Sequence, residues 1–334
     1  MDAVHPNMSD YEARAWKALL DWREEQLSKR ERRLPAPIRH GADRAKRLAA
    51  QGWDKVPGND MIQEGLFKAV EGLHEGVTDV AIRTLKQDAI IQSYASAGHP
   101  IEALDEIRKL DLEVVDARLP DLTFRYAAVI GVEGAAAGAL MGGASLAAVG
   151  GGVAGAGAGA APGAFAAVGT MTADVTALLT GSTRGAAHYM GYYGFDVRRP
   201  EERAFMLATM SIGLVSGQVA KQKAFAQLHK LVGLLARDAT WKVLNQDAFV
   251  RLSGALFSKL GERLVKQKLG QLLPFAGAVI GGGMNYSYVR SVTSSAYWLG
   301  RERFLMDKYE LHPPIDIDDE SVITDIEIIP DEGE

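Results

Sequence analysis

The sequence contains no cysteine. Thiol nucleophiles, disulfides, zinc–thiolate sites and iron–sulfur clusters are therefore excluded. The N-terminal residues also lack the basic segment and apolar run that a secretory signal requires. We therefore expect a cytoplasmic protein, free in the cytoplasm or peripheral on the inner face of the cell membrane.

Strand periodicity is almost missing as well. Apolar and polar residues alternate only near the C-terminus, whereas helical periodicity recurs from residue 11 to residue 309. The expected fold class is all-α. Residues 56–310 are expected to form a single large helical domain.

The strongly basic composition of nucleic-acid-binding proteins is absent. The net charge is −5, and residues 315–334 carry nine acidic residues and no basic one, so the remainder carries +4. We expect no nucleic-acid partner. Residues 311–334 are predicted to be an acidic tail without stable structure.

Positive charge gathers instead near the N-terminus. Residues 29–47 hold eight Lys or Arg and overlap the end of a predicted helix over Tyr11–Arg33 that contains two tryptophans. Residues 1–55 are therefore predicted to be a basic amphipathic helical arm. Such an arm either packs against the domain with its charges in water or lies on an anionic membrane surface.

Charge is absent from residues 134–173, of which 12 are Gly and 16 are Ala. Gly150, Gly152 and Gly155 match a dinucleotide-binding loop, but no strand precedes them. The segment is too apolar for a flexible linker and too poor in large apolar residues for a stable membrane span. Small residues at Gly134 and Gly138 let helices approach closely. We predict a buried Gly/Ala-rich helical hairpin, and the sequence leaves open whether it enters a membrane.

Local signals predict further helices. Ile101–Arg118 has the apolar spacing of one amphipathic helix, and Pro200 favours a helix that begins there. Gly194 is expected to cap the C-terminus of the preceding helix. The helical pattern then continues over Met206–Leu269.

Polar residues in an otherwise apolar region form the candidate site. Asp174 and Arg184 are ten residues apart, so their side chains can meet only across a bend near Gly181. A buried carboxylate needs a partner, and a structural ion pair is favoured over a catalytic acid. The predicted buried polar cluster contains Asp174, Arg184, His188, Tyr192, Asp196 and Asn285.

Motifs for catalysis and cofactor binding are missing. The chain has no H-E-x-x-H, no G-x-S-x-G and no G-x-x-x-x-G-K-[ST]. We interpret His188 as a hydrogen-bonded core residue rather than a metal ligand. The sequence thus favours a protein without catalytic residues, metal or cofactor.

Four further segments occur in a recognisable order around the Gly/Ala segment. They are "IEALDEIRKLDLEVVDARLP" (101–120), "GYYGFDVRRPEER" (191–203), "LLPFAGAVIGGGMNYSYV" (272–289) and "RERF" (301–304). As a set, over roughly residues 16–309, they resemble the EcsC family of bacterial proteins. The resemblance implies an accessory role at the cytoplasmic face of the membrane, beside an ABC-type transporter. It implies no enzymatic activity and no catalytic residues.

The leading functional hypothesis is a non-enzymatic, membrane-associated accessory protein. Its partners would be a membrane surface or a membrane protein such as an ABC transporter. Two alternatives remain. One is a soluble helical protein whose hairpin lines a pocket for a lipid or another apolar ligand. The other is a hydrolase that uses the Asp174 and Arg184 cluster.

Overall fold

The computed structural model describes residues 4–28, 64, 68, 74–130, 160–215, 217–236, 246–269 and 277–312. Over these residues the chain forms helices and no strand, which confirms the predicted all-α class. Residues 29–63, 131–159 and 313–334 lie outside the described residues. The basic segment and most of the predicted hairpin and acidic tail are therefore untested predictions.

The described helices follow one another along the chain with short connections where both neighbours are described. They are α1 (Asp10–Leu27), α4 (His74–Arg83), α5 (Gln87–Ala95), the 3₁₀ helix η1 (Leu104–Lys109), α6 (Leu112–Arg118), a helix over 122–130, α8 (Ala160–Tyr192), α9 (Pro200–Leu214), α10 (Gln218–Leu235), α12 (Gln246–Leu269) and α13 (Gly277–Lys308).

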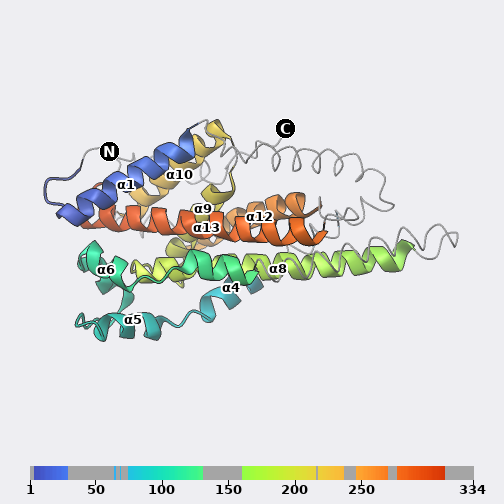
Figure 1. The fold of residues 1–334 in the computed structure, drawn as a ribbon, viewed down its shortest axis with the longest axis horizontal. Helices are drawn as coiled ribbons and strands as arrows, with labels where there is room; N and C mark the ends of the chain where they lie inside the picture. Colours follow the sequence, from blue (N-terminus) through green and yellow to red (C-terminus); the bar gives the residue numbers. More distant parts are fainter. Residues whose placement is uncertain are drawn as a thin grey trace.

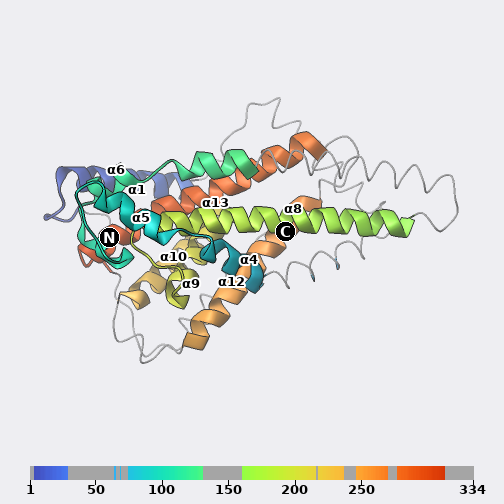
Figure 2. The same cartoon turned by 90° about the horizontal axis from the view of Figure 1, so that it is seen from below.

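Two long helices, α8 and α13, run side by side along the molecule (Figures 1 and 2). They are parallel, because contacts advance in the same direction along both. A Cβ at Gly185 would come within 2.8 Å of Thr293, and one at Gly300 within 2.9 Å of Tyr193. Small residues thus permit close helix approach here, the property that we expected of the Gly/Ala segment.

The other helices cover this pair on different sides. Helices α1 and α10 lie beside α13, and α4 lies against α8 (Figure 1). Helix α9 packs on α13, α12 and α10. Pro200 occupies the first turn of α9 as predicted, but the continuous pattern predicted from Met206 is interrupted. Gly217, with a φ of 90°, separates α9 from α10.

The single helix predicted over Ile101–Arg118 is wrong. The structure has two shorter helices, η1 and α6, because Leu110 is extended and Asp111 occupies the N-cap position of α6. Lys308 stabilises this break, since its Nζ donates to the Leu110 carbonyl oxygen at 3.4 Å and to Asp111 Oδ1 at 2.7 Å. A contact from the far end of the chain thus overrides the local helical pattern.

Helix α1 packs on the domain. Trp16 and Trp22 are buried, and the Trp22 ring stacks on Trp298 of α13 at a centroid distance of 5.7 Å. Neither tryptophan can therefore contact a membrane in this structure. Of the two interpretations of the arm, packing against the domain holds for the described helix.

Glu12 anchors the first turn of α1. Its buried carboxylate accepts hydrogen bonds from Lys308 Nζ at 2.8 Å and from the Leu112 amide at 3.3 Å, and it completes a capping box with Ser9. Burial alone would raise the pKa of Glu12. The hydrogen bonds, including that from the Tyr309 hydroxyl, outweigh burial and lower its pKa to about 2. Glu12 is therefore ionised at neutral pH and joins α1 to α6 and α13.

Candidate functional site

The six residues of the predicted polar cluster do not lie together. Asp174 on α8 accepts a hydrogen bond from Asn285 Nδ2 on α13 at 3.0 Å, and both side chains are buried. This contact lies in the seam between the two long helices.

Arg184 lies far from Asp174. Helix α8 is uninterrupted from Ala160 to Tyr192, so ten residues place the two about 15 Å apart along its axis. The bend expected near Gly181 does not form, since the helix is continuous through this residue, and Ile130 packs where a Gly181 side chain would lie. Arg184 Nη2 instead donates to the Thr84 carbonyl oxygen at 3.3 Å. The predicted Asp174–Arg184 ion pair is therefore wrong.

Arg184, His188 and Tyr192 follow at intervals of four residues and are half-buried on one side of α8. His188 Nδ1 lies 3.0 Å from the Tyr126 hydroxyl oxygen, and its ring centroid lies 6.1 Å from that of Tyr192. Burial, together with Arg184 and Arg125, lowers the pKa of His188 to about 4. His188 is neutral at physiological pH.

Asp196 follows the end of α8 and makes local contacts. It accepts hydrogen bonds from Gln87 Nε2 at 2.8 Å and Arg198 Nε at 2.9 Å. Burial raises the pKa of Asp196, but these hydrogen bonds outweigh it and lower the pKa. Gly194 has a φ of 84°, and the Phe195 amide donates to the Met190 carbonyl oxygen at 2.9 Å. The predicted glycine cap of α8 is confirmed.

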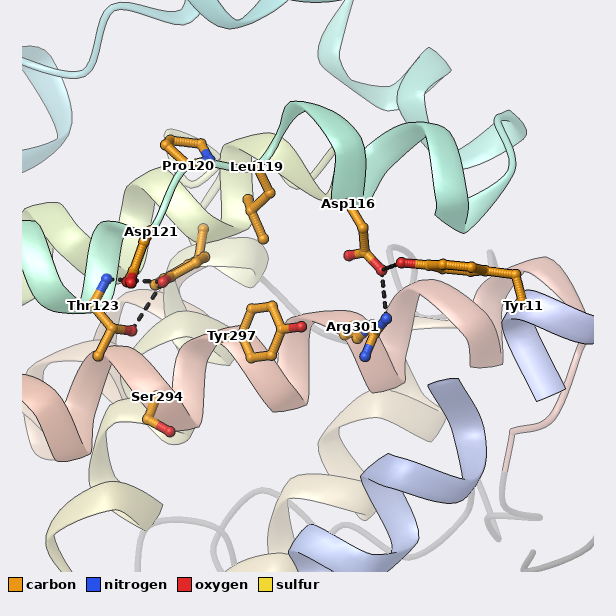
Figure 3. A pocket seen from close by; sticks show the side chains of 10 residues that line it. Tyr11, Asp116, Leu119, Pro120, Asp121, Thr123, Ser294, Tyr297 and Arg301 are labelled. Carbon is orange, nitrogen blue, oxygen red and sulfur yellow. Dashed lines mark hydrogen bonds and ion pairs between the residues drawn. The ribbon is translucent and has the colours of Figure 1, made fainter. Parts of the chain in front are cut away.

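A pocket of about 350 Å³ lies elsewhere, where α6, α8 and α13 meet the start of α1. Figure 3 shows side chains from segments that are far apart in sequence. The lining residues are Tyr11, Asp116, Leu119, Pro120, Asp121, Thr123, Tyr189, Ser294, Tyr297 and Arg301.

Asp116 is the centre of the hydrogen bonds in this pocket. Its Oδ2 accepts from the Tyr11 hydroxyl at 2.8 Å and from the Arg301 guanidinium (Figure 3). Burial and the bond to Asp116 raise the pKa of Tyr11 to about 12, so Tyr11 stays a neutral donor. The Arg301 guanidinium also lies 5.7 Å from the ring centroid of Tyr297. The charged side chains of Asp116 and Arg301 thus form an ion pair with each other.

Two hydroxyls remain available to a bound molecule. Within the described residues, Ser294 and Tyr297 have side-chain oxygens that make no hydrogen bond, and both line the pocket. Tyr189 and Thr123 are already joined, since the Tyr189 hydroxyl oxygen lies 2.9 Å from Thr123 Oγ1. The lining suits recognition of a small polar molecule better than proton transfer, because it offers no histidine beside a nucleophile.

Sequence reasoning missed the pocket. Asp116 and Arg301 are separated by 185 residues, and no local pattern shows that they pair. The available signal was the four-residue spacing of Tyr297 and Arg301, which places both on one side of α13. Over the described residues, no three His, Asp or Glu side chains converge to hold a metal ion.

Residues 144–305 match the model of the EcsC protein family. This chain belongs to the EcsC family. The match covers all six residues of the predicted cluster and the pocket residues of α8 and α13, but neither Tyr11 nor Asp116. It is shorter than the resemblance that we expected over residues 16–309. No curated protein and no solved structure matches the chain significantly.

The EcsC-family chain was expected to be too poor in large apolar residues for a stable membrane span. Among the helices that the structure describes, none combines the length and the apolar character needed to cross a bilayer.

Proposed function

We propose that this EcsC-family chain is a non-enzymatic accessory protein that attaches to the cytoplasmic surface of a membrane, beside a membrane protein such as an ABC-type transporter. One observation carries the proposal. Phe124 and Val129 on the helix over 122–130 are 61% and 60% exposed, shortly before the uncharged segment that begins at residue 134. The transfer of an exposed phenylalanine from water into the apolar part of a lipid interface is favourable.

The charge pattern supports this proposal. Arg125 is exposed between these two apolar side chains, and eight basic residues lie within residues 29–47. Basic residues beside exposed apolar ones favour binding to an anionic membrane surface. The transporter as partner rests on the family resemblance, and its test is co-purification with the transporter from membranes of the same cell.

Sedimentation of the purified full chain with phospholipid vesicles tests the membrane contact. We expect the wild type to bind, and Phe124→Ser to weaken the partition about tenfold because the variant loses the apolar transfer free energy. Val129→Ser should act in the same direction, whereas Val219→Ser on α10, where the valine is 52% exposed, should change nothing. A wild-type chain that stays wholly in the supernatant would refute the proposal.

A second candidate function is the binding of a small ligand in the pocket. The free hydroxyls of Ser294 and Tyr297, in the same pocket as Asp116, favour a polar ligand rather than the apolar ligand expected from the sequence. We expect native mass spectrometry of the purified chain to reveal a bound small molecule that is lost in Ser294→Trp. Ser287→Trp, at an exposed position of α13, should retain it. Equal loss or retention in both variants would contradict a ligand in this pocket.

The hydrolase alternative depended on a joint Asp174–Arg184 site. Because these residues are about 15 Å apart along α8, no observation in the structure favours that activity.

A further inference from the structure

The half-buried polar residues of α8 lie between two other segments. On one side, Tyr126 of the helix over 122–130 packs against Gly185 and bonds His188. On the other side, the Thr84 carbonyl at the end of α4 contacts Arg184. In Figure 2 the two segments lie on opposite sides of α8. We call Arg125, Tyr126, Arg184, His188 and Tyr192 the α8 cationic site.

The two arginines of the α8 cationic site have no carboxylate partner among the described residues. Arg184 has only the Thr84 carbonyl, and its Nε is buried without a hydrogen-bond partner. A guanidinium that is partly withdrawn from water gains most from an anion that accepts two hydrogen bonds. The site therefore has unused capacity for a negatively charged group.

The nearby carboxylates are engaged elsewhere. Asp196 pairs with Arg198 at 2.8 Å, and Asp79 pairs with Arg83 at 3.1 Å. Asp121, one turn before Arg125, accepts from the Phe124 amide at 3.0 Å. Because these carboxylates bind other groups, the α8 cationic site keeps a net positive charge. Both of its arginines help to lower the pKa of His188.

Exposed apolar side chains occur on both segments that flank the site. Phe124 and Val129 lie on the helix over 122–130, and Val80 lies one turn before Thr84 on α4. These are three of the six large apolar side chains that the described residues leave exposed. Cationic side chains, with exposed apolar side chains on the neighbouring segments, match a ligand that carries both a phosphate and a hydrocarbon chain.

We propose that the α8 cationic site binds the phosphate of an anionic phospholipid headgroup, with Arg184 and Arg125 as the donors. Phe124 and Val129 would then face the acyl region of the same leaflet. This inference rests on the proposed membrane association and names its lipid partner. The guanidinium groups supply paired donors to phosphate oxygens, which a single surface charge does not.

The test compares vesicles of phosphatidylcholine alone with vesicles that also contain phosphatidylglycerol, at one physiological salt concentration. The full wild-type chain is expected to prefer the anionic vesicles. Arg184→Gln and Arg125→Gln should each weaken that preference roughly fivefold, and the double variant roughly 10- to 30-fold. Binding to phosphatidylcholine alone should change little, since the apolar residues remain.

The matched control is Arg14→Gln with Lys17→Gln. It also removes two positive charges, but from exposed positions of α1. It should lose much less of the preference than the double variant of the site. Unfolding midpoints of all variants, measured by circular dichroism, should equal that of the wild type. Arg184→Lys tests the paired donors, because it keeps the charge and should still lose affinity.

The outcomes separate the two proposals. Vesicle binding with an unchanged preference in the double variant, or an equal loss in the α1 control, overturns the lipid site and leaves membrane association intact. No binding to any vesicle overturns both. Binding of inorganic phosphate or glycerol phosphate, abolished by Arg184→Gln while vesicles are ignored, assigns the site to a soluble anion and overturns the lipid proposal.

Discussion

Arg303→Met is expected to lower the free energy of unfolding by about 3–5 kcal/mol. Arg303 is buried, with its guanidinium 4.3 Å from the ring centroid of Phe195 and 4.5 Å from that of Phe205. Its Nη2 donates to Glu202 Oε1 at 2.9 Å, and Nη1 bonds the other carboxylate oxygen. Methionine would replace much of the volume but leave Glu202 buried without an opposite charge.

The size of the effect follows from desolvation. A buried carboxylate loses its water shell, and only an opposite charge with good geometry offsets that loss. Removing one partner is therefore far more harmful than removing both. The double variant Arg303→Met with Glu202→Met should recover much of the lost stability, because neither charge then remains buried alone.

Urea unfolding followed by circular dichroism measures these effects. The control is Arg198→Met, since Arg198 is 62% exposed and pairs with Asp196 at 2.8 Å on the surface. Exposed pairs contribute about 0–1 kcal/mol, so this variant should stay close to the wild type. If Arg303→Met also stays within about 1 kcal/mol of the wild type, the buried pair does not hold α9 against α13.

Gly194→Ala is expected to cost about 2–4 kcal/mol, from two separate causes. The φ of Gly194 is 84°, a conformation that is strained for any residue with a Cβ. In addition, the new Cβ would lie 2.7 Å from the Leu104 carbonyl oxygen and 2.9 Å from Arg108 Cγ. The cap of α8 and the first residue of η1 would have to separate.

Substitutions at two other glycines allow the backbone strain and the steric clash to be measured separately. Gly98 has a φ of 87° with nothing within 4 Å of the position that a Cβ would take, so Gly98→Ala should cost only the backbone strain, about 1–2 kcal/mol. Gly76 in α4 has open space and no positive φ, so Gly76→Ala should stabilise by up to about 1 kcal/mol. An equal loss of unfolding free energy in Gly194→Ala and Gly98→Ala would show that η1 moves away from the new Cβ without loss of stability.

Local signals predicted the features that depend on near neighbours in sequence. Pro200 marks the first turn of α9 because its fixed φ and missing amide suit that place. Gly194 caps α8 because the turn requires a positive φ. The break before α6 had such a signal too, since Asp111 is a typical N-cap residue, but the apolar spacing around it favoured one helix.

The features that escaped prediction depend on contacts between distant segments. Asp174 and Arg184 were paired because both are polar within an apolar region, yet the partner of Asp174 is Asn285, 111 residues away. Two residues ten positions apart on one continuous helix do not meet, however close they are in sequence. In the same way, Asp116 binds Arg301 across 185 residues. Patterns within one sequence do not reveal which distant segments will pack together.

The parallel course of α8 and α13 has a consequence for how the protein is made. The Asp174–Asn285 contact joins residues 111 positions apart, so α8 leaves the ribosome long before its neighbour exists. At synthesis rates of roughly 5–20 residues per second, this delay lasts about 6–22 s. During that time the side of α8 that carries Gly185 and Tyr189 has no α13 to cover it, because these residues contact Thr293 and Tyr297 in the folded protein. The nascent chain therefore passes through an interval in which chaperones can bind, and proteases can cleave, the exposed side of α8 before α13 packs against it.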